Sequence, residues 1–500
     1  MTKSGVQIII GAALMASAAN GLWSPYANGL MQLAGIYLLY EVLSENKYKN
    51  KIFLSWLFTT SWLAGSVWWL YIALHEFGGL PIVITLIALL LLCGGLALYY
   101  MGAIAVWTYA HKELPKIYRP LVFAACWTFA ELARAQWWTG FPWAAVGYSH
   151  VDTTLSLVAP FVGVYGVGFL AVALSAIAYE YFKERKWWVL VILGVCLTVP
   201  MSFHKQNQAE TTATTVKLLQ ANIRQDEKFN VARQEALEWY LSEIKNNNAD
   251  IVVLPETAIP YIKEDLPDDF WTQLKQITQD KAVIVGIPTR DKDKGYGNSA
   301  IGLGFEQELQ YDKYHLVPFG EFTPTAFKWF TQMMSLDYGD FNRGSINQPA
   351  FKWGDQRMAV TICYEDLFGE DLAVRFKDVA NAPTLFVNIS NIGWFGNTPV
   401  VDQHIDIARM RSKEFNRPTI RATNTGGTAI ISSEGEVVAK LQPYVRGHLM
   451  GNLPASSKEI TAFAYWAGHW GLMPFWMITA GIMLMTLLFK RFRHRGESVK

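Results

Sequence analysis

The sequence has 500 residues, more than a single ordinary domain of about 100–200 residues holds. Hydrophobic residues make up 51% and charged residues 17%, a balance shifted toward membrane proteins, yet a mean hydropathy of +0.15 is too low for a chain embedded throughout. The formal net charge of +1 gives no electrostatic case for nucleic acid. This composition excludes a disordered chain, a disulfide scaffold and a simple soluble enzyme, and predicts a membrane part joined to a water-facing part.

Apolar runs follow one another through residues 1–203. Each is long enough for a helix that crosses the hydrocarbon layer, which takes about 20 residues. The predicted spans are 5–21, 25–43, 52–74, 81–109, 120–138, 154–182 and 187–203, with an eighth at 467–489. The segment Ala16-Ser17-Ala18 also fits the end of a cleaved signal peptide, but further spans follow and we favour an uncleaved first helix.

The character of the sequence changes after Lys205. Charges become frequent, and short β-type runs are separated by turn residues until about residue 460. We therefore expect a seven-helix transmembrane domain at 1–205, a polar domain at 206–460, and the eighth helix with a basic tail at 461–500.

Basic residues lie on alternate loops between the predicted spans. The basic loops and tail contain Lys47, Lys49, Lys51, Lys112, Lys116, Arg119, Lys183, Arg185, Lys186, Lys490, Arg491, Arg493 and Arg495. The other connections, near 22–24, 75–80 and 139–153, contain neither Lys nor Arg. By the positive-inside rule the basic set is cytoplasmic. Seven spans then deliver the polar domain to the outer side, and the C-terminus is expected in the cytoplasm.

Cys363 is the only cysteine of the polar domain, since Cys93, Cys126 and Cys196 lie in apolar spans. It has no disulfide partner within that domain, and an unpaired thiol in an oxidising compartment is either buried and inert or reactive. The apolar strand pattern 359–362 runs directly into Cys363, and catalytic groups of α/β folds gather at such strand ends. The context therefore favours a nucleophile.

A thiol nucleophile needs a base and a stabilising charge, and two other predicted strand ends offer them. The run 251–255 leads to Glu256, and the run 308–312 leads to Lys313. Each residue alone fits an ordinary surface position. Together they predict a site in which Glu256 takes the thiol proton and Lys313 stabilises first the thiolate and then the oxyanion.

The order strand-Pro-Glu, Lys, strand-Cys-Tyr-Glu resembles the Glu-Lys-Cys site of the nitrilase superfamily. With seven spans before it and one after, the chain resembles the apolipoprotein N-acyltransferase family of bacterial inner membranes. The motifs that carry this resemblance are Arg134 with Thr139–Trp143, Gly147–Ser149, Gln220–Ile223, Leu254–Thr257, Asn298-Ser299, Lys313 with Leu316–Glu321, Ile362–Glu365 and Arg421–Gly426. Arg224, Phe229 and Ile392 depart from the usual family residues Pro, Trp and Asp.

The resemblance implies a membrane α-helical bundle of eight transmembrane helices plus an extracytoplasmic, periplasmic α/β domain with the nitrilase-like α-β-β-α sandwich. It implies transfer of an acyl chain from a membrane phospholipid, through a thioester on Cys363, to the α-amine of a diacylglyceryl-modified apolipoprotein. Glu321, Tyr364 and Glu365 are expected to support the triad, Tyr364 through its backbone N–H. No cofactor, no metal and no nucleic acid is implied.

Five residues are candidates for contact with lipid. Trp329 and Phe330 lie in the aromatic and Met-rich stretch 324–334, expected either as an arm that dips into the outer leaflet or as a core helix. For Trp394 and Phe395 the same two alternatives are open, contact with the membrane or a place in the core. Arg134 lies near the outer end of the fifth span, where it can pair with Glu131 or meet a lipid phosphate.

Two other functions fit part of the sequence. A membrane-anchored nitrilase-type amidase that hydrolyses a small amide would use the same triad, although one anchor helix would suffice for it. A transporter or receptor with an outer binding domain would usually carry ionisable residues along a membrane pathway. The predicted spans here hold few such residues, chiefly Glu131 and Arg134.

Overall fold

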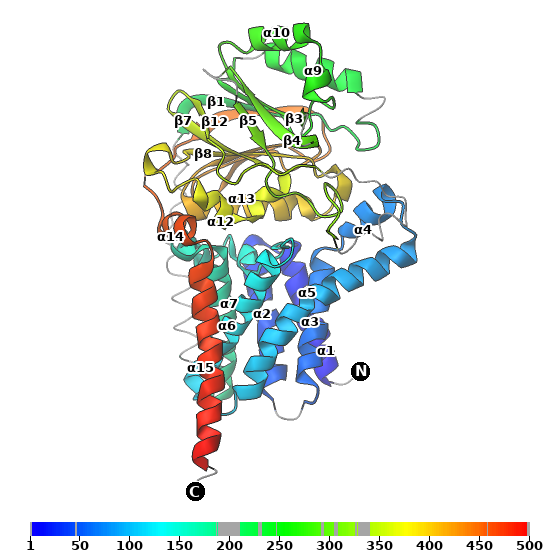
Figure 1. Ribbon diagram of the computed structural model, residues 1–500. Helices are drawn as coiled ribbons and strands as arrows, with labels where there is room; N and C mark the ends of the chain where they lie inside the picture. Colours follow the sequence, from blue (N-terminus) through cyan, green and yellow to red (C-terminus); the bar gives the residue numbers. More distant parts are fainter. Residues whose placement is uncertain are drawn as a thin grey trace. The chain divides into compact units, whose positions relative to one another are not determined.

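The computed structural model describes residues 3–45, 48–186, 188, 211–228, 233–246, 248–291, 295–304, 309–325, 328, 341–457 and 459–497. The chain divides into two compact units, one formed by Met1–Gln206 with Trp470–Lys500 and the other by Asn207–His469. The first unit is helical, and the second contains the β-sheets (Figure 1).

Long helices dominate the first unit. They are α1 (Lys3–Ala19), α2 (Pro25–Ser44), α3 (Lys51–Ser66), α5 (Ile82–Ala110), α6 (Arg119–Gln136), α7 (Ala159–Lys183) and α15 (Met473–Glu497). Within the described ranges, three helical stretches are long and apolar enough to cross a membrane: Ile82–Ala110, Thr154–Lys183 and Met473–Arg493. These three lie at or near predicted spans. The span predicted at 187–203 lies outside the described residues, apart from residue 188.

The span predicted at 52–74 is bent in the structure. Helix α3 and the following segment Leu70–Phe77, which begins with α4 (Leu70–Ile72), together meet the criteria for a span but differ in direction by 71°. The break follows the pair Gly65-Ser66, and the Ser66 hydroxyl donates back to the carbonyl of Trp62. Gly/Ser pairs and such back-bonding hydroxyls are common causes of helix kinks.

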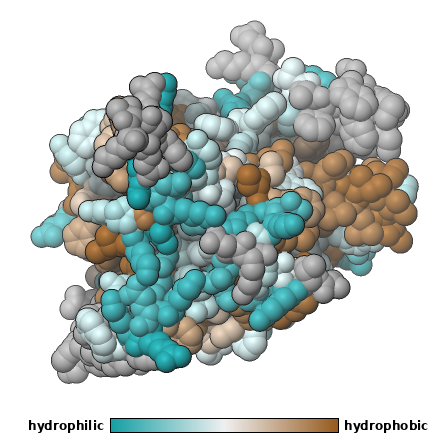
Figure 2. Space-filling view, turned by 90° about the horizontal axis from the view of Figure 1, so that it is seen from below, coloured by the Kyte–Doolittle hydropathy of each residue, from teal (hydrophilic) through white to brown (hydrophobic). Residues whose placement is uncertain are grey.

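Apolar side chains remain exposed on the helical unit. On α5 they include Ile82, Val83, Leu86, Ile87, Leu90 and Leu91, and on α15 Met473, Met477, Ile478, Leu484 and Met485. Figure 2 shows a broad brown area at the right of the view, the side to which α5 extends in Figure 1. Water-soluble proteins rarely expose contiguous apolar patches of more than a few hundred Å². This surface is therefore suited to contact with lipid tails.

Two six-stranded sheets form the centre of the second unit. The first has the order β12 (Gly447–Pro454), β1 (Thr211–Gln220), β2 (Ile251–Val253), β3 (Ala282–Asp291), β4 (Gly295–Leu303), β5 (Leu309–Asp312). The second has the order β11 (Val437–Lys440), β10 (Ala429–Ile431), β9 (Thr419–Thr423), β8 (Leu385–Ser390), β7 (Gln356–Ile362), β6 (Phe351–Trp353). In each sheet three neighbouring strands are parallel: β1, β2 and β3 in one, and β7, β8 and β9 in the other.

Helices cover the outer faces of both sheets. Residues of α9 (Arg233–Lys245) and α10 (Asp268–Ile277) pack on the first sheet. Residues of α12 (Gly369–Val374), α13 (Val400–Phe415) and α14 (Ala462–Trp470) pack on the second. The result is a four-layer α-β-β-α sandwich, visible in the upper half of Figure 1.

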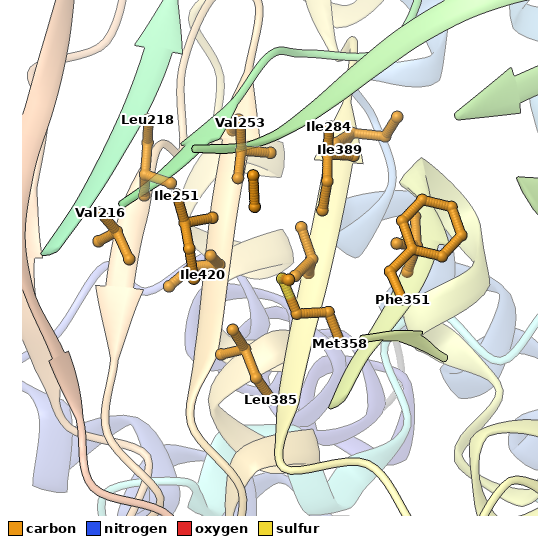
Figure 3. Packing of buried hydrophobic residues seen from close by; sticks show 14 of the residues in the cluster. Val216, Leu218, Ile251, Val253, Ile284, Phe351, Met358, Leu385, Ile389 and Ile420 are labelled. Carbon is orange, nitrogen blue, oxygen red and sulfur yellow. The ribbon is translucent and has the colours of Figure 1, made fainter. Parts of the chain in front are cut away.

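The space between the sheets is filled by β-branched and other apolar side chains. Figure 3 shows Val216, Ile251 and Ile284 from the first sheet together with Leu385 and Ile389 from the second. Side chains alternate along a strand, so β7 turns residues 358, 360 and 362 into this core and residue 359 toward the helices. Because a shift by one residue would turn the apolar side chains away from the core, this alternation fixes the register of β7. It thereby also fixes the position of Cys363, the residue directly after the strand.

Because Gly286 in β3 has no side chain, the backbone of Pro255 and Glu256, after β2, can lie close to it. A methyl group there would overlap the carbonyl oxygen of Pro255 and lie 2.7 Å from Cα of Glu256. Because both neighbours are backbone atoms, Gly286→Ala is expected to lower the free energy of unfolding by about 1–3 kcal/mol, measured by denaturant unfolding of the purified protein. Gly447→Ala is the control, since its methyl group would meet only Leu441 at 3.9 Å. Equal stability of the two variants would contradict the prediction.

Candidate active site

Glu256, Lys313 and Cys363 all lie just beyond the ends of strands. Glu256 follows β2, Lys313 follows β5, and Cys363 follows β7. Nζ of Lys313 lies 3.3 Å from Oε1 of Glu256. Glu256 and Lys313 are near enough to the Cys363 sulfur for their charges to shift its pKa. The structure therefore brings the three predicted residues together, two from the first sheet and one from the second.

Lys313 is held between two carboxylates. Its Nζ donates to Oε1 of Glu321 at 2.9 Å as well as to Glu256. Asn298 Nδ2 donates to the same two carboxylates, at 2.7 Å each. Although burial lowers the pKa of Lys313, the charges of Glu256 and Glu321 raise it above its ordinary value. The ammonium group is therefore a permanent cation in the site.

Backbone N–H groups fix the remaining carboxylate oxygens. The N–H of Asn391 donates to Oε2 of Glu256 at 2.8 Å, and the N–H of Val317 donates to Oε2 of Glu321 at 2.8 Å. Glu256 is 7% exposed and Lys313 1% exposed. The carboxylate of Glu256 and the ammonium group of Lys313 are thus preorganised away from bulk water, which strengthens their electrostatic effect on the neighbouring thiol.

The thiol of Cys363 is protonated at rest. Burial raises its pKa to about 12, and the carboxylate of Glu256 acts in the same direction, against the opposing charge of Lys313. A thiolate at neutral pH is therefore a very small fraction. Nucleophilic attack requires a base that removes the proton during the reaction, which is the role expected for Glu256.

Glu365 connects the segment that carries Lys313 to the end of β7. Its Oε1 accepts the N–H of Tyr314 at 2.6 Å, and its Oε2 accepts the N–H of Ile362 at 2.7 Å. The hydroxyl of Tyr311 donates to both oxygens, at 2.9 and 2.8 Å. This buried carboxylate therefore ties the residue before Cys363 to the residue after Lys313. Its pKa is raised by burial, against these hydrogen bonds.

The backbone is strained where the site is built. Cys363 has a φ of 53° and Thr257, next to Glu256, a φ of 50°. Such left-handed conformations cost of order 1–3 kcal/mol in a non-glycine residue and persist only when the surroundings impose them. At Cys363 the turn presents the thiol at the end of β7 and starts the 3-10 helix Cys363–Leu367.

Lys228 and Asn391 are buried polar residues beside the site that the sequence analysis did not name as candidates. Lys228 is 2% exposed and donates to the backbone carbonyl of Glu256 at 3.0 Å; burial lowers its pKa to about 8. Asn391 follows β8 directly, and its side chain joins Gln225 at 2.7 Å and Asn424 at 3.1 Å. Asn391 and Asn424 each follow a strand directly, which was the available signal in the sequence. Asparagines are common in turns, so this position alone did not identify them as site residues.

His404 is also part of the surroundings of the site, although by spacing it looks isolated. Its Nε2 lies 3.0 Å from Oδ1 of Asp366 and 3.2 Å from the carbonyl oxygen of Cys363. His404 comes from α13, 41 residues after Cys363 in the sequence. Only the packing of α13 on the second sheet reveals this contact.

The lipid-contact candidates have different positions. Arg134 is 1% exposed; its Nε donates to the Tyr100 hydroxyl at 3.1 Å and its Nη1 to the carbonyls of Phe141 and Trp143. Arg134 therefore holds the loop that follows α6. Trp394 is 41% exposed at the second unit's surface, close in sequence to Asn391.

Two of the remaining candidates, Trp329 and Phe330, lie outside the described residues, as does most of the stretch 324–334. Phe395, like Trp394, belongs to the 3-10 helix Gly393–Phe395. Contact of any of these five side chains with lipid stays a prediction.

Known families match both parts of the chain. Residues 12–177 match the apolipoprotein N-acyltransferase N-terminal domain, and residues 215–461 match carbon-nitrogen hydrolase. An apolipoprotein N-acyltransferase of Verminephrobacter eiseniae is 42% identical over 445 residues, which cover 83% of this chain and 82% of the relative. The chain belongs to the apolipoprotein N-acyltransferase family. Another member, from Ralstonia nicotianae, is 35% identical over 487 residues, covering 94% of this chain and 90% of the relative.

Membership of this family confirms the resemblance drawn from the motifs, and the two six-stranded sheets confirm the expected nitrilase-like fold. Among solved structures, a Saccharomyces cerevisiae member of branch 10 of the nitrilase superfamily aligns with a TM-score of 0.36 at 16% identity, covering 48% of this chain and 90% of that chain.

The raised pKa of Cys363 predicts how its alkylation depends on pH. Iodoacetamide reacts with the thiolate, so the rate at Cys363 is expected to rise about tenfold per pH unit from about pH 7 to about pH 10, without a plateau. Peptide mass analysis of the full-length protein measures this rate. Glu256→Gln removes a negative charge that raises the thiol pKa, so its profile is expected to move to lower pH. A plateau in the alkylation rate below about pH 9 in the unaltered protein would contradict the raised pKa of Cys363.

Proposed function

We propose that this protein is an acyltransferase that N-acylates lipoproteins. The acyl chain comes from a membrane phospholipid, passes through a thioester on Cys363, and is delivered to the α-amine of a diacylglyceryl-modified apolipoprotein. The observation that carries the proposal is the buried Lys313, held by Glu256 and Glu321 beside the Cys363 thiol, in a chain of the apolipoprotein N-acyltransferase family.

The first half-reaction forms the thioester. Glu256 takes the proton from Cys363 as the sulfur attacks the ester carbonyl, and Lys313 with the backbone N–H of Tyr364 stabilises the oxyanion. When the carbon–oxygen bond of the ester breaks, the protonated Glu256 returns the proton to the departing alkoxide. The products are an acylated Cys363 and a lysophospholipid.

The second half-reaction transfers the acyl chain to nitrogen. Glu256 takes a proton from the incoming amine, the nitrogen attacks the thioester carbonyl, and the same donors stabilise the new oxyanion. The carbon–sulfur bond then breaks, and the proton on Glu256 passes to the sulfur. One base thus serves both proton transfers, which is the logic of a ping-pong reaction.

We propose eight transmembrane helices, with domains at 1–205, 206–460 and 461–500. The catalytic domain lies in the periplasm and the C-terminus in the cytoplasm of a bacterial inner membrane. The basic residues on alternate loops support this orientation. Lipid is expected to reach Cys363 from the outer leaflet.

The amidase alternative uses the same triad, so the geometry of the triad does not separate it from acyl transfer. The match of residues 12–177 to the N-terminal domain of the acyltransferase family favours transfer, because a small-amide hydrolase has no need of such a domain. The transporter or receptor alternative gives no reason for a base and a cation buried beside a thiol. Release of ammonia from small amides would favour the amidase.

The proposed nucleophile predicts the outcome of replacing it. Cys363→Ala is expected to abolish formation of an acyl adduct while leaving a folded, membrane-inserted protein, because the methyl side chain cannot attack an ester. Intact-mass analysis of purified protein mixed with phospholipid measures the adduct. Cys93→Ala, which replaces a buried thiol of α5, is the control and should retain it. An adduct of unchanged yield in Cys363→Ala would rule out the mechanism.

The assigned roles of Glu256 and Lys313 predict that substitution of either residue abolishes acylation of Cys363. Glu256→Gln is expected to lose both acylation and transfer, since one base serves both. Lys313→Arg is expected to fail like Lys313→Ala, because a planar guanidinium does not replace a compact ammonium held between two carboxylates. The measurement is the single-turnover acylation burst with phospholipid. Normal acylation by Glu256→Gln would contradict the role of the base.

The proposed orientation predicts where reporter proteins work. A reporter that is active only outside the cytoplasm should be active when fused after residue 206 and inactive when fused after Lys500. A cytoplasmic reporter at the same two points serves as the control and should give the reverse. If both results are inverted, the catalytic domain faces the cytosol and the orientation is wrong.

A further inference from the structure

A buried network of charged and polar side chains contacts the backbone carbonyl of the proposed nucleophile, Cys363. Oδ1 of Asp366 lies 3.0 Å from Nε2 of His404, and Nη1 of Arg421 donates to Oδ2 of Asp366 at 2.6 Å. Asp366 is 4% exposed, His404 1% and Arg421 0%. The three residues come from the turn after β7, from α13 and from β9. Neither half-reaction described above uses any of these side chains.

The contacts of His404 define where its proton lies. Its Nε2 is within hydrogen-bond distance of Asp366 Oδ1 and of the carbonyl oxygen of Cys363, at 3.2 Å. Burial raises the pKa of Asp366, but His404 and Arg421 lower it below its ordinary value, so the group is a carboxylate. Both neighbours of Nε2 are then acceptors only, and Nε2 must carry the hydrogen. The one hydrogen on Nε2 is therefore shared between Asp366 Oδ1 and the Cys363 carbonyl oxygen, as a bifurcated hydrogen bond.

The Cys363 carbonyl receives a second donor from the sheet. Asn388 Nδ2 lies 3.2 Å from the same oxygen, and the Asn388 side chain is itself held by Thr361 and Ser390. At Cys363 the backbone leaves the extended conformation with a φ of 53°. Two side-chain donors thus fix a carbonyl in a conformation that the chain would not adopt unaided.

This carbonyl shares one peptide unit with the N–H of Tyr364. A peptide unit is planar and trans, so its C=O and N–H point in opposite directions. Any donor that fixes the direction of the Cys363 oxygen therefore also fixes the direction of the Tyr364 N–H. That N–H is the backbone donor assigned above to the oxyanion.

We propose that His404, clamped by Asp366 and Arg421, is a positioning residue for the oxyanion site. By its hydrogen bond to the Cys363 carbonyl, His404 orients the peptide unit so that the Tyr364 N–H points toward the oxygen of the reacting acyl group. The inference rests on the proposed role of Cys363 as nucleophile. The charged clamp suits this task because Arg421 holds Asp366 Oδ2, so that Asp366 Oδ1 is a fixed acceptor for Nε2 of His404.

Three substitutions of His404 in the full-length enzyme in detergent micelles test the proposal. Phe keeps a ring but removes the donor. Gln places an amide nitrogen near the position of Nε2, whereas Asn places it near Nδ1, one methylene short. The acylation burst with a soluble short-chain ester requires the oxyanion site, whereas iodoacetamide alkylation of Cys363 requires only a folded protein and its thiol.

His404→Phe is expected to slow acylation by about 10²–10³-fold, the usual loss for one oxyanion donor, with the KM for the ester and the alkylation rate changed by less than about threefold. His404→Gln should recover at least about tenfold over His404→Phe, and His404→Asn should not. If His404→Phe does not fold, the difference between the Gln and Asn variants decides the question, since both introduce an amide.

Equal losses of acylation and alkylation would overturn the proposal, because they would show that His404 only supports the fold. Equal acylation by the Gln and Asn variants would overturn it as well. Failure of the unaltered enzyme to form any adduct on Cys363 would instead contradict the proposed function, so the two failures are distinguishable.

Discussion

The buried ammonium group of Lys313 is the constraint on which the rest of the site depends. A charge with 1% exposure is strongly destabilising unless it is paired, and two carboxylates, Glu256 and Glu321, pair it. Those carboxylates need donors of their own, which Asn298 and the backbone of Asn391 and Val317 supply. One buried cation thus requires a defined shell of polar groups, and that shell forms the proposed catalytic site.

The same pairing governs the reactivity of the thiol. Two carboxylates offset the single cation, so the field at Cys363 does not favour a thiolate, and burial raises the pKa of the thiol to about 12. In the proposed mechanism the nucleophile is consequently generated only when Glu256 removes the proton in the reaction. The raised pKa also limits oxidation of the thiol, because oxidation proceeds through the thiolate.

The two sheets contribute different residues to the proposed site, and the packing of one sheet on the other brings these residues together. Glu256 and Lys313 follow strands of the first sheet, whereas Cys363 and Asn391 follow strands of the second. The N–H of Asn391 crosses to Glu256, and Glu365 crosses to the segment after β5. The apolar core between the sheets therefore fixes the catalytic distances as well as the fold, since a shift of one strand by one residue would turn every side chain to the other face.

The sequence by itself indicated many of the elements and the candidate reacting groups that the structure brings together. Apolar length marked the long helices, and the runs ending at Glu256, Lys313 and Cys363 marked strand ends, because both signals are local. The sequence did not reveal the bend after Ser66, the hydrogen bonds that Asn298 makes to Glu256 and Glu321, or the contact of His404 with the Cys363 carbonyl. These depend on residues far apart in the chain, and only the packing of helices and sheets decides which buried polar groups meet.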